Sequence, residues 1–126
     1  MYHGSDQLLD IINPKHSNLI DADVVFGTPS KYMASCFIPR WTDEEVEMGH
    51  IDGRLYIKEL VSDALTKWHC SGYIYQLDSV DFSTHENLGM RDEFISYVSH
   101  KPKKVIYVNN VIDFIKDHID IHTYIH

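Results

Sequence analysis

The sequence has few cysteines and no long apolar run. Cys36 and Cys70 are the only two cysteines, which is too few for a disulfide framework, and their spacing matches no zinc motif. This usage is typical of a reducing compartment, so we expect a cytoplasmic protein. No apolar run approaches the length of about 18 residues that a transmembrane helix needs. The start, MYHGSDQLLD, lacks the basic and apolar regions of a secretory signal, and we expect none.

Basic residues are also scarce. Eleven Lys and Arg stand against 19 Asp and Glu, which gives a net charge of -8 when the nine histidines are neutral. Such a balance argues against general binding to duplex nucleic acid, because that binding needs a basic face to displace counterions. The only basic concentration, at residues 101–104, is interpreted as a solvated loop.

The composition is that of a globular chain, with 44% hydrophobic and 24% charged residues. A chain of 126 residues is expected to form a single domain over residues 1–126. Glycine and proline divide it into short elements, which predicts an α+β fold with the helices mainly in the N-terminal half. Strands are predicted at residues 2–4, 24–26, 55–57, 73–77, 93–98, 105–108 and 119–125. Helices are predicted at residues 31–38, from residue 42, within 60–68 and after residue 109 or 110.

Three histidines recur every four residues near the end of the chain, at His118, His122 and His126. On a helix they would share one face and could chelate a metal. The alternating pattern of residues 119–125 favours a strand, on which residues four apart are about 13 Å from each other. One ion cannot span that distance, so no metal site is expected.

The first candidate for chemistry is the segment Tyr2-His3-Gly4-Ser5. A histidine, a glycine and a serine at a strand end place several hydrogen-bonding groups in a small volume, and glycine permits close approach of a ligand to the backbone. By itself the segment is more typical of an ordinary turn in which Ser5 caps a short helix.

Two further candidates lie later in the chain. Phe26 and Phe37 are eleven residues apart and could hold a flat heterocycle between them, although apolar periodicity favours a core role for at least one ring. Glu93 opens a predicted strand, where a carboxylate can accept a hydrogen bond from a sugar hydroxyl and stabilise a developing oxocarbenium ion. The alternative for Glu93 is an ordinary charge at a sheet edge.

Taken in order, these segments resemble the ADP-ribosyltransferase superfamily, in its diphtheria-toxin and poly(ADP-ribose) polymerase branch. That branch has a His-Gly-Ser/Thr motif on its first strand, then two aromatic residues flanking a short helix, then a glutamate that opens a late strand. Here these resemble His3-Gly4-Ser5, Phe26 through Ala34 to Phe37, and Glu93. The resemblance covers residues 2 to about 108 and implies a split β-sheet core.

The resemblance also implies a substrate, NAD⁺, and a role for each matched residue. His3 would bond a ribose hydroxyl, the Gly4 backbone would hold the nicotinamide amide, and Ser5 would add a polar contact. Phe26 and Phe37 would stack on the nicotinamide ring. Glu93 would bond the 2′-hydroxyl of the nicotinamide ribose and stabilise positive charge as the glycosidic bond breaks. No metal is implied.

The lead hypothesis is therefore a mono-ADP-ribosyltransferase that acts on an unidentified protein, nucleic acid or small-molecule acceptor. The family commonly has tyrosine at both aromatic positions, and phenylalanine here favours an alternative, a catalytically inactive module that binds NAD⁺ or ADP-ribose. Arg91 stands where arginine-specific members have glutamate, so arginine is a disfavoured acceptor. An RNA 2′-phosphotransferase ranks last, because the chain is acidic and has no arginine-rich stretch near the motifs.

Overall fold

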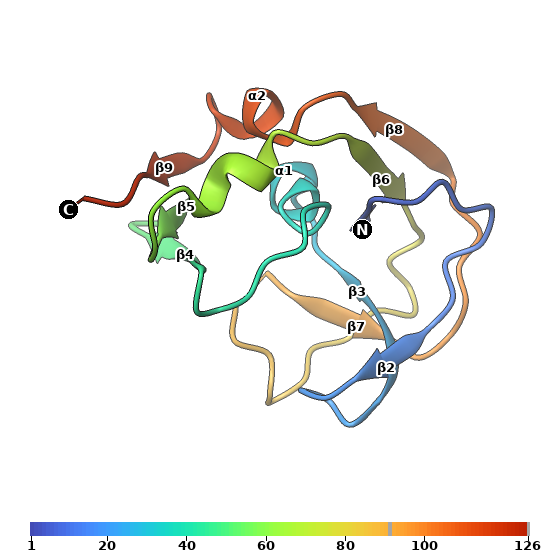
Figure 1. The fold of residues 1–126 in the computed structure, drawn as a ribbon. Coiled ribbons are helices and arrows are strands. Elements are labelled where there is room, and N and C mark those ends of the chain that lie inside the picture. The colour runs from blue at the N-terminus through green and yellow to red at the C-terminus, as the bar shows by residue number, and fades with distance from the viewer. Residues whose placement is uncertain (91, 126) are drawn as a thin grey trace.

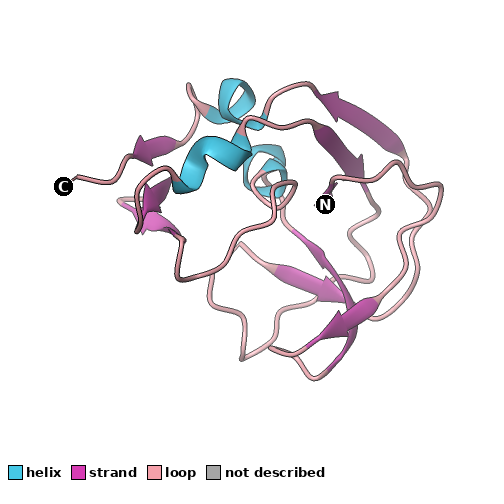
Figure 2. Cartoon of the chain, in the orientation of Figure 1, coloured by secondary structure: helices cyan, strands magenta, loops and turns pink. Residues whose placement is uncertain are grey.

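The computed structural model describes residues 1–90 and 92–125 and has an α+β architecture made mostly of strands. Two short α-helices and one 3₁₀ helix join strands of three to six residues (Figure 2). The strands are β1 Tyr2–Ser5, β2 Lys15–Ser17, β3 Ala22–Gly27, β4 Val46–Ile51, β5 Arg54–Glu59, β6 Gly72–Gln76, β7 Phe94–Ser96, β8 Lys104–Val108 and β9 Asp120–His122. The helices are α1 Lys31–Ser35, the 3₁₀ helix η1 Ala64–Trp68 and α2 Val111–Ile115.

The strands form three sheets of three strands each, in the orders β1-β6-β8, β2-β3-β7 and β4-β5-β9. All neighbours are antiparallel except β5 and β9. In Figure 1, α1 lies near the centre, with β2, β3 and β7 below it, β6 and β8 to one side, and β4, β5 and β9 to the other. The first two sheets meet where Tyr2 and Thr28 exchange backbone hydrogen bonds of 2.7 and 2.9 Å.

Helix α1 packs directly on the sheet that contains β1 and β6. Ser30 caps the helix, since its side chain accepts a hydrogen bond from the Met33 amide. A Cβ atom added at Gly4 in β1 would lie 2.0 Å from the carbonyl oxygen of Ala34, and one at Gly72 in β6 would lie 2.4 Å from Ile38. Glycine at both positions is therefore what lets the helix approach the strands so closely.

The main core lies between this helix, α2 and the sheets. Its largest member is Trp68, which is completely buried and packs at 5.8 Å, centroid to centroid, from Trp41. Two smaller clusters lie under β6 and under β3. Within the described residues, no helix is long and apolar enough to cross a membrane.

The helices are not concentrated in the N-terminal half as expected, because one lies at residues 31–35, one at 64–68 and one at 111–115. The helix predicted from residue 42 is replaced by a turn. Thr42 and Glu45 do make the hydrogen bond of a capping box. The helix does not continue, because Val46 begins β4, whose backbone pairs with β5. Ser5 ends β1 and accepts a bond from the Gln7 amide in a turn, so it caps no helix.

We expect Gly4→Ala to lower the free energy of unfolding by about 3 kcal/mol, because the added methyl group would overlap the Ala34 carbonyl and force α1 away from β1. Urea unfolding followed by circular dichroism measures the change. Gly89→Ala is the matched control, since a Cβ there meets nothing within 4 Å. Equal stabilities of the two variants would contradict this account of the helix packing.

Candidate functional site

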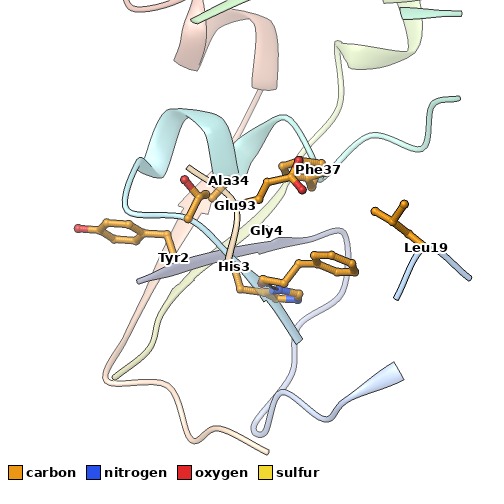
Figure 3. Close-up of a pocket in the computed structure, with 10 residues that line it drawn as sticks. Tyr2, His3, Gly4, Leu19, Ala34, Phe37 and Glu93 are labelled. Atoms are coloured by element: carbon orange, nitrogen blue, oxygen red, sulfur yellow. Dashed lines mark hydrogen bonds between the residues drawn. The ribbon is translucent and has the colours of Figure 1, made fainter. Parts of the chain in front are cut away.

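A cavity of about 320 Å³ lies between β1, the end of β3, α1 and the start of β7. Its walls include five of the six residues singled out in the sequence: His3, Gly4, Phe26, Phe37 and Glu93. These residues come from four segments that are separated along the chain. In Figure 3, Glu93 and Phe37 lie on one side of the cavity and His3 on the other. The volume is at the lower end of the range for small-molecule sites.

The imidazole of His3 has a defined orientation. Its Nδ1 atom lies 2.7 Å from the carbonyl oxygen of Phe26, and because a carbonyl can only accept, Nδ1 carries the proton. Burial lowers the pKa of His3, and the charges of Lys15 and His100 lower it further, against the raising effect of the bond to Phe26. The ring is therefore neutral at pH 7, and Nε2 is left as an acceptor for a hydroxyl group.

The backbone of Gly4 faces the same side of β1 as the cavity. Met1 and Leu77 exchange backbone hydrogen bonds. In an antiparallel ladder every second residue bonds the neighbouring strand, so His3 and Ser5 bond β6, and the amide and carbonyl of Gly4 point away from β6. Among the described residues, no hydrogen bond outside the β1–β6 ladder uses the amide or carbonyl of Gly4. The two groups suit a ligand that both donates and accepts, such as a carboxamide.

The two phenylalanines play different parts in the cavity wall. Phe26 is half-buried in β3 and also packs on the cluster of Ile20, Val24 and Ile95, so it has the core role that the sequence suggested for one ring. Phe37 follows α1, is 43% exposed and stacks on Trp41 with 6.2 Å between centroids. An aromatic side chain this exposed at a cavity offers a face to a planar ligand.

Glu93 is half-buried and immediately precedes β7. Among the described residues, no hydrogen bond or ion pair holds its carboxylate. Burial raises the pKa of the Glu93 carboxyl, and the negative charge of Asp43 raises it further. A desolvated carboxylate at a cavity with no stabilising partner is a common property of functional groups.

The neighbouring acid, Asp92, is engaged elsewhere. Its carboxylate lies 3.4 Å from Nε2 of His50 in β4, and it lines a separate polar hollow with Arg54 and His118. Of the two adjacent acids, only Glu93 lines the cavity. The contact between Asp92 and His50 ties the segment before β7 to the β4–β5 hairpin and so helps to place Glu93.

Some expectations from the sequence lie outside the cavity. Ser5 does not line it, and Arg91 lies outside the described residues. Sequence reasoning missed Leu19; the wall is completed by Tyr2, Gly27, Thr28 and Ala34, which lie within the matched segments but were given no role. Leu19 lies in the loop between β2 and β3, and its exposure of 53% is unusual for leucine, but no pattern in the sequence indicates where this loop folds back.

Other potentially reactive side chains are occupied or distant. Cys36 is buried, which raises its pKa to about 12 and keeps the thiol protonated. His118 stacks on Tyr32 at 3.8 Å, and His122 meets the edge of Tyr56; His126 lies outside the described residues. No cluster of three or more metal-ligating side chains occurs within residues 1–90 and 92–125.

Comparison with known proteins returned no family model, no curated protein and no solved structure that matches the chain. The functional argument therefore rests on the geometry of the cavity and on the chemistry of the residues that line it.

We expect the Glu93 carboxyl to titrate above 4.5, its ordinary pKa, because of its burial and of the nearby Asp43. Asp43→Asn should move the titration to lower pH, since it removes the second of these causes. Carboxyl-carbon NMR shifts measured against pH test this. Asp81→Asn, which removes an exposed charge outside the cavity, is expected to leave the titration in place. A Glu93 titration at or below 4.5 in the unmodified protein would contradict the expectation.

Proposed function

We propose that the protein binds NAD⁺ in this cavity, cleaves the bond between nicotinamide and ribose, and transfers ADP-ribose to an acceptor. The proposal includes the split-sheet fold of the ADP-ribosyltransferases. The observation that carries it is the convergence of His3, Gly4, Phe26, Phe37 and Glu93 on one cavity. These residues are distant in the sequence but line one cavity. Packing of the core does not require a histidine or a carboxylate at this place, so their presence supports a ligand site.

The chemical groups of the cavity suit the nicotinamide riboside half of NAD⁺. The amide and carbonyl of Gly4, which no hydrogen bond outside the ladder uses among the described residues, complement the nicotinamide carboxamide, and the exposed ring of Phe37 can stack on the pyridinium. The volume of about 320 Å³ fits this half and not the whole dinucleotide, so the adenosine half extends over the surface. Lys15, which is exposed and close enough to affect His3, places a positive charge for the pyrophosphate on that side.

In this proposal Glu93 performs the electrostatic work. As the glycosidic bond breaks, the electron pair of that bond moves to the ring nitrogen of nicotinamide. Nicotinamide leaves uncharged, and positive charge develops on the ribose. The Glu93 carboxylate accepts a hydrogen bond from the 2′-hydroxyl and stabilises that charge in apolar surroundings, where screening is weak. His3 accepts a hydroxyl bond at Nε2 and orients the substrate.

We expect Glu93→Gln to slow nicotinamide release from NAD⁺ by about 10²-fold or more, because the amide cannot stabilise the developing charge. Chromatographic detection of free nicotinamide measures the rate, and calorimetry measures whether NAD⁺ still binds. Glu86→Gln is the control, since Glu86 is exposed and lies outside the cavity. Equal release by the protein and by the Glu93→Gln variant would remove this role. Binding of NAD⁺ with no turnover in the unmodified protein would favour the inactive binding module.

We expect Phe37→Ala to weaken NAD⁺ binding by about five-fold, because it removes a stacking partner worth about 1 kcal/mol. Phe37→Tyr should bind as well as the unmodified protein, since it keeps the aromatic face. Calorimetric titration with NAD⁺ compares the three. Both substitutions change a partly exposed side chain, so thermal unfolding should be nearly unchanged. If alanine and tyrosine bind equally, Phe37 does not stack on the ligand.

A further inference from the structure

A second hollow of about 440 Å³ adjoins the cavity. Leu19, Phe37 and Glu93 line both spaces, so a molecule in the second hollow touches the same carboxylate as a molecule in the first. If NAD⁺ occupies the cavity as proposed above, the reacting ribose carbon lies beside Glu93. The second hollow then leads to the place from which an acceptor must approach.

The wall of the second hollow has an ordered aromatic part. Trp41 donates a hydrogen bond of 2.7 Å from Nε1 to the carbonyl of Cys36 and stacks on Phe37. Both rings line the hollow. Because its indole is held at the nitrogen and packs on both Phe37 and Trp68, Trp41 has a fixed position in the wall of the hollow. Aromatic faces attract organic cations as well as apolar groups.

The charged residues that line the second hollow within the described part of the chain are all acidic. Asp43, Glu47 and Glu93 line it, and none of its described lining residues is Lys, Arg or His. Glu47 is fixed by a hydrogen bond of 2.8 Å from the hydroxyl of Tyr56. The negative charge of Asp43 contributes to the raised pKa of the Glu93 carboxyl. A cation bound here would relieve the repulsion between these two acids, whereas an anion or a phosphate would increase it.

We propose that this second hollow is the acceptor subsite and that it selects acceptors that carry an ammonium group. The ammonium is held between Asp43, Glu47 and the ring of Trp41, and a nucleophilic oxygen or nitrogen elsewhere on the same molecule reaches the ribose. The inference rests on the proposed function, because without bound NAD⁺ the hollow has nothing to react with. It favours an amine-bearing molecule over an acidic protein or a nucleic acid.

The transfer step balances without a further reactant. The bond from the ribose anomeric carbon to nicotinamide breaks, and its electron pair neutralises the pyridinium nitrogen. A lone pair of the acceptor oxygen or nitrogen forms the new bond to the same carbon. The proton that the acceptor loses passes to the Glu93 carboxylate, whose raised pKa suits it to receive one.

The test uses four five-carbon probes that differ only in their end groups: pentane-1,5-diamine, 5-aminopentan-1-ol, pentane-1,5-diol and glutarate. Each is titrated into the protein at low ionic strength, where charge effects are least screened, and the indole resonance of Trp41 is followed by NMR. The diamine should give the tightest saturable shift and the amino alcohol a weaker one. The diol and glutarate should give none over the same range.

Asp43→Asn should weaken diamine binding by about five- to ten-fold, and Asp81→Asn, which removes a charge outside the hollow, should not. With NAD⁺ present, mass spectrometry should detect ADP-ribose joined to 5-aminopentan-1-ol, whose hydroxyl oxygen has a lone pair while its amino group is an ammonium ion. Equal shifts with the diol, or unchanged affinity in Asp43→Asn, would overturn the subsite. If NAD⁺ is bound and hydrolysed while the probes are not distinguished, only the subsite is wrong. If calorimetry finds no NAD⁺ binding, the proposed function fails, and the acceptor role fails with it.

Discussion

The close packing of α1 on strands β1 and β6 is the constraint on which the site depends. Two glycines, Gly4 and Gly72, permit it, because any side chain there would meet the helix or the segment that follows it. His3 precedes Gly4 in β1, and Phe37 comes two residues after α1 ends. The distance between helix and strand therefore sets the distance between the imidazole and the exposed aromatic ring. Gly4 thus has a structural reason to be glycine, besides the ligand-binding role that is proposed for its backbone.

The opposite wall of the cavity is placed by sheet pairing. Phe26 lies across from Ile95, and Gly27 from Phe94, in the pairing of β3 with β7. This register brings Glu93, the residue before β7, beside the end of β3. The cavity is thus built from elements that belong to different sheets, and the contact between Tyr2 and Thr28 joins those sheets. Its shape is a property of the folded chain as a whole and of no single motif.

Much of the fold could be predicted where local signals are strong. Runs of β-branched and aromatic residues gave β3, β6 and β8, and Asn110 caps α2 through a bond to the Asp113 amide. Strand β4 was missed because its glycine, Gly49, weakens the pattern; in the fold the ring of Tyr56 covers it from the paired strand. The following Asp52-Gly53, both with positive φ, is the hairpin turn that could have revealed the strand.

Five residues that line the first cavity could be singled out in the sequence because they belong to an ordered set of short motifs, but the second hollow could not be predicted. Its wall joins the loop at Leu19, the turn at Asp43 and the segment at Met90, which only tertiary packing brings together. The secondary-structure propensities of neighbouring residues do not indicate which loops come into contact in the folded chain.

Glu93 connects the energetics of the fold with its chemistry. Placing a carboxylate in a mostly apolar wall, near a second acid and without a partner among the described residues, makes the ionised form less stable than it would be in water. Among the described residues, no hydrogen bond or ion pair of the Glu93 carboxylate offsets that cost. A positive charge beside Glu93 would stabilise the ionised carboxylate and so offset this cost. Such a charge could develop on a ribose in the first cavity or belong to an ammonium group in the second hollow. The same unfavourable placement thus supports both proposals, because each supplies a positive charge that none of the described residues places beside the Glu93 carboxylate.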